Sequence, residues 1–203
     1  MGVNLVKGQK VNLQKSDGGV LRKVVVGLGW DEAQPEKPKG LLGGLFGAKP
    51  VQAFDCDATA FLCINGRVAS NTDIVYFGNL IHSSGSVQHM GDNLTGGGDG
   101  DDEQIIVNLE QVPQNYDKIV FVVNIYQAVQ RNQQFGMIKN AFIRIVDADT
   151  NQELCRYNLS ENYNGMTAMI FGEIYRHSGQ WKFSAVGQGT TDNDIKSLAR
   201  RFS

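Results

Sequence analysis

The chain has 203 residues, a formal net charge of −2 and a sequence pI near 5.9. This charge gives no electrostatic basis for binding nucleic acid or an anionic membrane surface. The length suffices for one large domain, and we expect residues 1–203 to form a single domain.

The three cysteines, Cys56, Cys63 and Cys155, form an odd count without a CxxC pair. This count argues against a disulfide framework or a zinc ribbon and favours reduced thiols. Residues 1–7 lack the apolar segment of a signal peptide, and no apolar run approaches the length of a transmembrane helix. We therefore expect a cytoplasmic protein without a transmembrane segment.

The first half of the chain has the periodicity of β-strands. Residues 20–28 are rich in β-branched side chains, and residues 54–64 lead into Asn65-Gly66, a signal for a two-residue hairpin turn. Between these strands, residues 32–54 hold three prolines around an apolar, glycine-rich tip and predict an inserted loop. This insertion is either an unstructured loop or a segment that docks on a partner or a membrane surface.

The second half continues the strand pattern. Further strands are predicted at residues 104–109, 118–126, 141–146, 152–159, 166–175 and 181–186, the last four as two hairpins. Residues 127–134 predict a short helix or turn, and residues 192–202 predict a capped helix with Ile195, Leu198 and Phe202 on one stripe. Nine or ten strands with little helix predict an all-β fold, an antiparallel β-sandwich with a short C-terminal helix.

The most unusual stretch is residues 91–103, which hold five carboxylates and five glycines and neither lysine nor arginine. Crowded carboxylates repel one another, and a hard divalent cation relieves that repulsion. Oxygen ligands without sulfur suit calcium or magnesium, and glycines let backbone carbonyls turn toward an ion. The stretch predicts a calcium-binding loop, and the alternative is a solvated acidic loop.

Common loops of similar composition do not fit. An EF-hand that starts at Asp99 would have Gln104 in place of its glycine, and a strand pattern follows instead of a helix. The Gly-Lys-Ser/Thr triplet of a phosphate-binding loop does not occur. A calcium-binding β-helix needs several copies of its motif, and the acidic stretch occurs once.

Other carboxylates stand at expected strand ends. Asp55 and Asp57 are two residues apart, so on a strand they project from one face. They either share a cation or mark an acidic strand end that reaches water. Asp73 precedes another expected strand at residues 74–77. By the same alternation, Asp101 and Glu103 should face one way and Asp102 the other.

Several motifs, in this order, resemble the TerD family of tellurite-resistance and stress proteins. They are Trp30-Asp31 and residues 54–62, 91–96, 98–103, 140–144, 171–177, 181–183 and 185–189. The resemblance covers nearly the whole chain outside residues 32–53 and implies a β-sandwich that binds calcium in acidic loops. The chain departs from the family at Gly97, where glutamate is usual, and at Asn71, where aspartate is usual.

By analogy with this family, we expect the metal ligands among one set of oxygen-bearing residues. They are Asp31, Asp55, Asp57, Asp73, Asp92, Asn93, Thr95, Asp99, Asp101, Asp102 and Glu103. Calcium takes six to eight oxygens, so this set can serve two neighbouring Ca²⁺ ions. The resemblance implies a calcium-binding structural or signalling module, not an enzyme. Its protein partners would belong to a stress or tellurite-resistance complex, either free or associated with a membrane.

Two other functions are open. A metal-dependent phosphoester hydrolase would use a cation-activated water, with His82, His89 or His177 as the acid or base. However, no GxSxG, HExxH or Cys/His pairing is present. The other alternative is a small-ligand-binding module, for which the sequence indicates no specific pocket.

Overall fold

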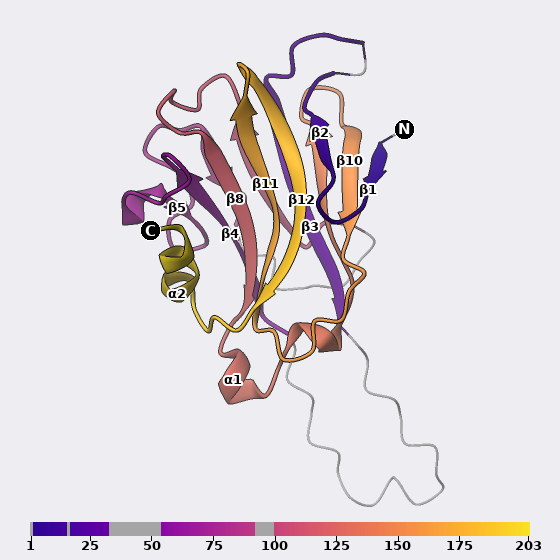
Figure 1. The fold of residues 1–203 in the computed structure, drawn as a ribbon, viewed down its shortest axis with the longest axis vertical. Helices are drawn as coiled ribbons and strands as arrows, with labels where there is room; N and C mark the ends of the chain where they lie inside the picture. Colours follow the sequence, from indigo (N-terminus) through magenta and orange to yellow (C-terminus); the bar gives the residue numbers. More distant parts are fainter. Residues whose placement is uncertain (1, 16, 33–53, 92–99) are drawn as a thin grey trace, which may run out of the picture.

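The computed structural model describes residues 2–15, 17–32, 54–91 and 100–203. In these ranges the chain forms two six-stranded sheets that face each other, with short helices at their margins (Figure 1). The predicted antiparallel β-sandwich with a short C-terminal helix is confirmed. The insertion predicted at residues 32–54 falls almost wholly outside the described residues. Among the residues described, no helix has the length and apolarity to cross a membrane.

The first sheet has the strand order β1-β10-β9-β3-β7-β6. Its strands are β1 (Val3–Leu5), β3 (Lys23–Glu32), β6 (Val87–His89), β7 (Glu103–Asn108), β9 (Ile138–Asp147) and β10 (Gln152–Asn158). Neighbouring strands are antiparallel except β1 and β10, which pair in parallel. Strand β1 was not predicted, because its three residues are held by a partner strand far away in the sequence.

The second sheet has the order β2-β12-β11-β8-β4-β5, and all its pairs are antiparallel. Its strands are β2 (Lys10–Asn12), β4 (Cys56–Cys63), β5 (Ile74–Val75), β8 (Lys118–Ile125), β11 (Ala168–His177) and β12 (Gln180–Thr190). The strand expected at residues 74–77 is shorter than predicted, because Tyr76 bridges back to Asn79. Asn65 and Gly66 both have positive φ, as the predicted two-residue turn requires.

The helices are short. They are η1 (Asn71–Asp73), α1 (Ala128–Arg131), η2 (Phe135–Met137), α2 (Ile195–Ala199) and η3 (Arg200–Phe202). The carboxylate of Asp194 accepts the Ser197 N–H at 2.7 Å and caps α2. Leu198 is buried in a cluster with Phe61, and Ile195 and Phe202 pack against the same cluster, which confirms the predicted stripe.

Strand β4 is buried on both faces, and alternation decides which side each residue meets. Cys56, Ala58 and Ala60 belong to the core between the sheets, whereas Phe61 and Cys63 belong to the cluster under α2. By position, Asp57 projects to the same outer face as Phe61.

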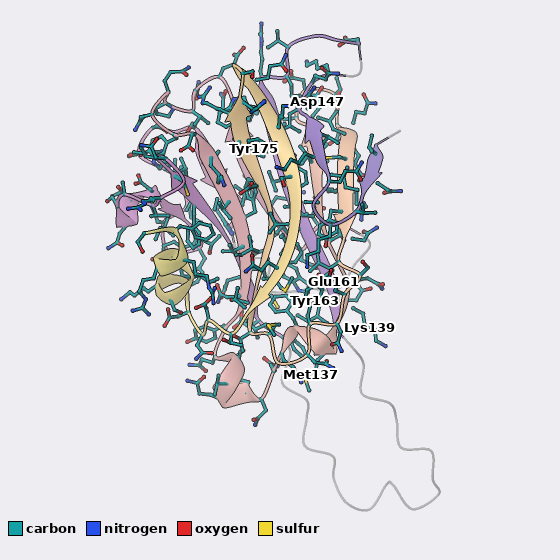
Figure 2. All side chains as sticks on the ribbon, in the orientation of Figure 1. Met137, Lys139, Asp147, Glu161, Tyr163 and Tyr175 are labelled. Carbon is teal, nitrogen blue, oxygen red and sulfur yellow. The ribbon has the colours of Figure 1, made fainter. Side chains whose placement is uncertain are left out.

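The two ends of the sandwich are separated in Figure 2, which shows Asp147 at one end and Lys139 at the other. Asp31 is the partner of Lys139 in the pairing of β3 with β9. The C-terminal end of β3 therefore lies at the end marked by Lys139, on the same side as α1 (Figure 1).

Candidate metal centre at one end of the sandwich

Four of the predicted ligands gather where β3 ends and β7 begins. Asp31 is at the end of β3, and Asp101, Asp102 and Glu103 lead into β7. We refer to these four residues as the acidic cluster. Four other predicted ligands lie outside the described residues; they are Asp92, Asn93, Thr95 and Asp99.

Asp102 is hydrogen-bonded to β3 through both its backbone and its side chain. Its N–H donates to the Leu28 carbonyl at 2.8 Å, and its Oδ2 accepts the Trp30 N–H at 2.6 Å. Burial raises the pKa of Asp102, and the charges of Asp31 and Asp101 raise it further, although the Trp30 hydrogen bond lowers it. Asp102 is therefore a buried carboxylate whose surroundings penalise its negative charge.

The negative charge of Asp101 is compensated by an arginine. Arg144 donates from Nε to Oδ1 at 2.7 Å and from Nη2 to Oδ2 at 3.0 Å. Arg144 lies opposite Gly27 in the β3–β9 pairing, and a Cβ at Gly27 would lie 2.2 Å from Asp101 Oδ2. The glycine thus leaves the space in which this bidentate pair forms, and the pair neutralises Asp101 within the protein.

The prediction that Asp101 and Glu103 share a face is wrong. Asp101 lies on the outer face of the first sheet, where it also accepts a hydrogen bond from Gln104 Nε2 at 2.9 Å. Glu103 is buried on the same inward side of β7 as Ile105. The reason is that β7 begins at Glu103, so the strand alternation does not extend back to Asp101.

Glu103 connects the two sheets. Its Oε2 accepts the Ala58 N–H of β4 at 2.6 Å and lies 3.3 Å from His89 Nε2. Strand β5 pairs with β4 only from Ala60 onward, so the carboxylate takes the place of a strand partner at Ala58. His89 Nδ1 accepts the Gly91 N–H, which assigns the ring proton to Nε2 and makes His89 a donor to Glu103.

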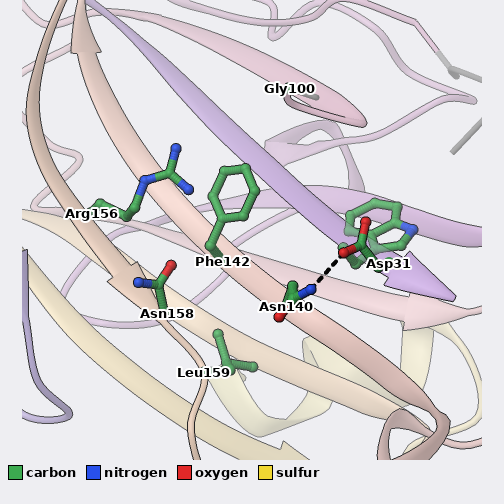
Figure 3. A pocket seen from close by; sticks show the side chains of 8 residues that line it. Asp31, Gly100, Asn140, Phe142, Arg156, Asn158 and Leu159 are labelled. Atoms are coloured by element: carbon green, nitrogen blue, oxygen red, sulfur yellow. Dashed lines mark hydrogen bonds between the residues drawn. The ribbon is translucent and has the colours of Figure 1, made fainter. Parts of the chain in front are cut away.

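Asp31 borders a polar pocket of about 450 Å³ on the outer face of the first sheet (Figure 3). Its Oδ2 accepts a hydrogen bond from Asn140 Nδ2 at 2.6 Å. Across the pocket, the Arg156 guanidinium stacks on the Phe142 ring at 4.0 Å from its centroid. Gly100 lines the same pocket, and its carbonyl oxygen lies beside Gly29 of β3.

Asp55 and Asp57 belong to the other sheet. Asp55 Oδ2 forms an ion pair with Arg131 Nη1 of α1 at 3.4 Å. Asp57 is buried opposite Asn124 of β8, on the outer side of β4. Asp57 is the chain neighbour of Ala58, whose N–H is hydrogen-bonded to Glu103 of the acidic cluster, whereas Asp55 is paired with Arg131.

Asp73 is buried in a network of its own. Its Oδ2 accepts the Ser70 N–H at 2.9 Å, and its Oδ1 accepts the Tyr116 hydroxyl at 2.7 Å and lies 3.4 Å from His82 Nε2. Because the next residue pairs with Phe61, Asp73 lies roughly 16 Å along β4 from Asp57. It is therefore separate from the acidic cluster as well.

Two residues that position the cluster, Arg144 and Asn140, were not predicted. Both lie in a stretch that resembles the family, but no role was predicted for either residue. An arginine within an apolar strand, together with Gly27 in a β-branched run, is the signal that could have indicated a buried ion pair.

Comparison with known proteins gives a consistent result. Residues 1–202 match the TerD domain family. The chain is 48% identical over 207 residues to stress response protein SCP2 of Bacillus subtilis (strain 168), covering 100% of both chains. It is 47% identical over 190 residues to tellurium resistance protein TerD of Serratia marcescens, covering 93% of this chain and 91% of that protein. Its fold is similar to the crystal structure of a telluride resistance protein homologue from Streptomyces coelicolor A3(2). That likeness has a TM-score of 0.63 and 20% identity, and covers 91% of this chain and 99% of that one.

Proposed function

The chain belongs to the TerD family of tellurium-resistance and stress-response proteins, and from this premise we propose that it binds Ca²⁺ at the acidic cluster. The observation that carries the proposal is the unfavourable environment of the Asp102 carboxylate. This carboxylate is buried, and Asp31 and Asp101 add negative charge beside it. A bound cation turns this unfavourable arrangement into a favourable one.

The donor set fits calcium. Asp31, Asp102 and the Gly100 carbonyl offer hard oxygen ligands, and sulfur is absent from them. Asp101 is engaged by Arg144 and Glu103 by Ala58, so we assign these two to positioning the site. Their contacts hold the start of β7 against β3 and β4.

The coordination shell needs more oxygens than these. Within the described ranges, no three His, Cys, Asp or Glu side chains are arranged to hold a metal ion. We propose that Asp92 and Asp99, with Asn93 and Thr95, supply the remaining ligands, because the sequence places them just before Gly100. Because Asp55 and Asp73 have partners of their own, we propose one ion at this cluster, and the second predicted ion stays a prediction.

The bound ion would serve the fold and its interactions. It would join the end of β3, the start of β7 and the stretch between residues 91 and 100. We propose that this calcium-stabilised end acts as a structural or interaction module in the stress response, consistent with the names of the relatives.

We propose that the protein is not an enzyme. His89, the histidine nearest the acidic cluster, is buried, and both its ring nitrogens are engaged, with Glu103 and with the Gly91 N–H. His82 lies between Asp73 and Ser84. Neither is placed to exchange a proton with a metal-bound water at Asp102. The three free thiols, Cys56, Cys63 and Cys155, are buried and support a cytoplasmic location, because such compartments keep thiols reduced.

Thermal unfolding with calcium and with a chelator tests this function. A ligand at about 100-fold excess over its Kd stabilises the folded state by about 2.7 kcal/mol. For a chain of this size, that shifts Tm by roughly 5–10 °C. A sensor role requires a Kd on the order of 10⁻⁷–10⁻⁵ M. Superimposable melting curves in calcium and in chelator would refute calcium binding, and Asp149→Asn is a matched control because Asp149 is exposed and paired with Lys15.

A further inference from the structure

A serine, a histidine and an aspartate form a hydrogen-bonded chain where the turn before β6 meets η1. His82 begins this turn: its N–H donates to the Val87 carbonyl at 3.0 Å, and its carbonyl accepts the Gly85 N–H at 2.8 Å. Ser84 Oγ lies 2.7 Å from His82 Nδ1, and His82 Nε2 lies 3.4 Å from Asp73 Oδ1. This is the order of a nucleophile, its base and the carboxylate that orients the base.

The contacts of His82 assign its proton. Its Nδ1 accepts the Ser84 backbone N–H at 3.2 Å, and because that group can only donate, Nδ1 is unprotonated. The ring proton is therefore on Nε2 and points to Asp73, and the Ser84 hydroxyl donates to Nδ1. The edge-to-face contact with the Tyr116 ring, at 5.2 Å between centroids, holds the imidazole in this orientation. His82 thus presents its basic nitrogen to the Ser84 hydroxyl.

The Ser84 hydroxyl belongs to an exposed residue, unlike its base. Ser84 is exposed, whereas His82 and Asp73 are 2% and 4% exposed. The buried Ser86 hydroxyl lies 2.7 Å from Ser84 Oγ. Because Ser84 donates to His82, the Ser86 hydroxyl donates to Ser84 Oγ and stabilises the negative charge that develops there as the proton leaves. Solvent access and an adjacent base are together what an activated nucleophile requires.

The surroundings of Ser84 favour an uncharged acyl donor over a phosphoryl donor. Residues 74–91 contain no lysine or arginine that could bind a phosphate. Leu80 and Ile81, which precede His82, are 43% and 51% exposed and give this segment apolar surface. An acyl group with an apolar body suits such a surface, whereas a phosphate would meet no counter-charge from this segment.

The backbone of the turn limits the reaction. The N–H groups of Ser84, Gly85 and Ser86 are engaged by His82 Nδ1, by the His82 carbonyl and by Ser84 Oγ. They are therefore not free to stabilise an oxyanion at Ser84. Without that help only an activated donor reacts, and the resulting ester is hydrolysed slowly. Such a site takes up one group and does not turn over, which agrees with the proposal that the protein is not an enzyme.

We propose that Ser84 is a site of covalent acylation by an activated ester or thioester, with His82 as the base and Asp73 as a positioning residue. Ser84 Oγ attacks the carbonyl carbon of the donor, and its proton passes to His82 Nδ1. The Oγ–C bond forms, the bond from the carbonyl carbon to the leaving group breaks, and the leaving group takes the proton from His82. The products are the Ser84 ester and a free alcohol or thiol. The reaction is independent of calcium at the acidic cluster.

An activated ester tests the proposal. The intact protein is treated with 4-nitrophenyl acetate, and peptide mass spectrometry follows acetylation of Ser84 and of Ser83, its exposed neighbour in the same turn. We expect Ser84 to react about 100-fold faster than Ser83, since a positioned base contributes roughly 10²–10⁴-fold. The ratio of the two rates should be the same in calcium and in chelator. Equal rates at the two serines would overturn the proposal.

Substitutions assign the roles. Ser84→Ala should abolish the fast release of about one equivalent of 4-nitrophenolate per chain, and the matched control Ser83→Ala should retain it. His82→Gln should bring the Ser84-to-Ser83 ratio close to one. Asp73→Asn can donate to Nε2 and favours the wrong tautomer of His82, so the ratio should fall about tenfold or more.

The ratio separates positioning from a structural role, because a loosened turn changes both serines alike. If the His82 and Asp73 variants do not fold, the wild-type ratio and Ser84→Ala decide, because Ser84 is exposed. The proposal is overturned if Ser84→Ala keeps the fast release, or if folded His82→Gln keeps the wild-type ratio. An unchanged ratio in folded Asp73→Asn removes Asp73 from the assignment.

Discussion

Asp73 and Asp102 are buried aspartates in different parts of the sandwich, and their surroundings are opposite. Asp73 accepts hydrogen bonds from the Ser70 N–H and the Tyr116 hydroxyl, and His82 stands beside it. Among the described residues, Asp102 has one donor to its side chain, the Trp30 N–H, and two further carboxylates nearby. Burial alone therefore does not identify a metal ligand. The number of internal donors and the sign of neighbouring charges separate a structural carboxylate from one that favours a cation.

The largest effect is expected at Asp73. Asp73→Ala removes one half of the capping box of η1 and leaves the Tyr116 hydroxyl and His82 Nε2 without their carboxylate. The free energy of unfolding should fall by about 3 kcal/mol, and by the same amount in calcium and in chelator. Urea denaturation under both conditions measures this. A loss seen in calcium alone would make Asp73 a metal ligand and remove the contrast with Asp102.

Arg144→Gln should give Asp101 surroundings like those of Asp102. Asp101 is almost fully buried, and without the guanidinium its charge is uncompensated. In chelator we expect the free energy of unfolding to fall by about 2 kcal/mol. This is less than for a fully buried ion pair, because Arg144 is partly exposed. Bound calcium should restore part of the lost stability.

The matched control for this change is Arg22→Gln, which breaks an exposed pair with Glu110. It should cost less than about 1 kcal/mol. Equal losses in the two variants would show that Arg144 does not compensate a buried charge.

Asp102→Asn should change stability by less than about 1 kcal/mol in chelator at neutral pH, because an amide oxygen can still accept the Trp30 N–H and the repulsion disappears. The pKa of Asp102 is raised above its ordinary value of 3.8, so the folded state holds this proton more tightly than the unfolded state. The stability that this proton gives is present below pH 3.8 and is lost as pH rises through the folded pKa. In unfolding measurements from acidic to neutral pH, Asp102→Asn should therefore not show this loss of stability. A pH profile identical to that of the wild type would contradict the assignment.

The smallest effect concerns titration of Tyr116. Burial and the Asp73 hydrogen bond raise the pKa of Tyr116 to about 12. Asp73→Asn should move this pKa toward the ordinary value of 10, measured by ultraviolet absorbance against a Tyr116→Phe reference. The stability linked to this hydroxyl is present below pH 10 and is lost toward pH 12, and the variant should lose less of it. An unchanged titration would mean that Asp73 does not interact with the phenol.

Local sequence patterns predicted much of the fold. The β-branched run of β3, the Asn65-Gly66 turn and the capped C-terminal helix each depend on neighbouring residues alone, and all three form, the helix with Asp194 as its cap. Strand β1 was missed because a distant partner holds it in place.

The candidate site was predictable only in part, because the sequence shows carboxylates but not the groups that face them. Arg144 lies on another strand from Asp101, and the Tyr116 hydroxyl comes to Asp73 from a distant segment. Hence both Asp73 and Asp102 were included among the predicted metal ligands. The family resemblance identified the acidic stretch but could not distinguish these two environments.

Calorimetric titration of Ca²⁺ into the wild-type protein, Asp102→Asn and Asp73→Asn tests the central claim most directly. The account predicts a saturable heat with about one ion bound per chain in the wild type, as proposed for a single oxygen-ligand site. This heat should be lost in Asp102→Asn and retained in Asp73→Asn. Absence of binding heat in the wild type, or an undiminished heat in Asp102→Asn, would contradict the assignment of the calcium site.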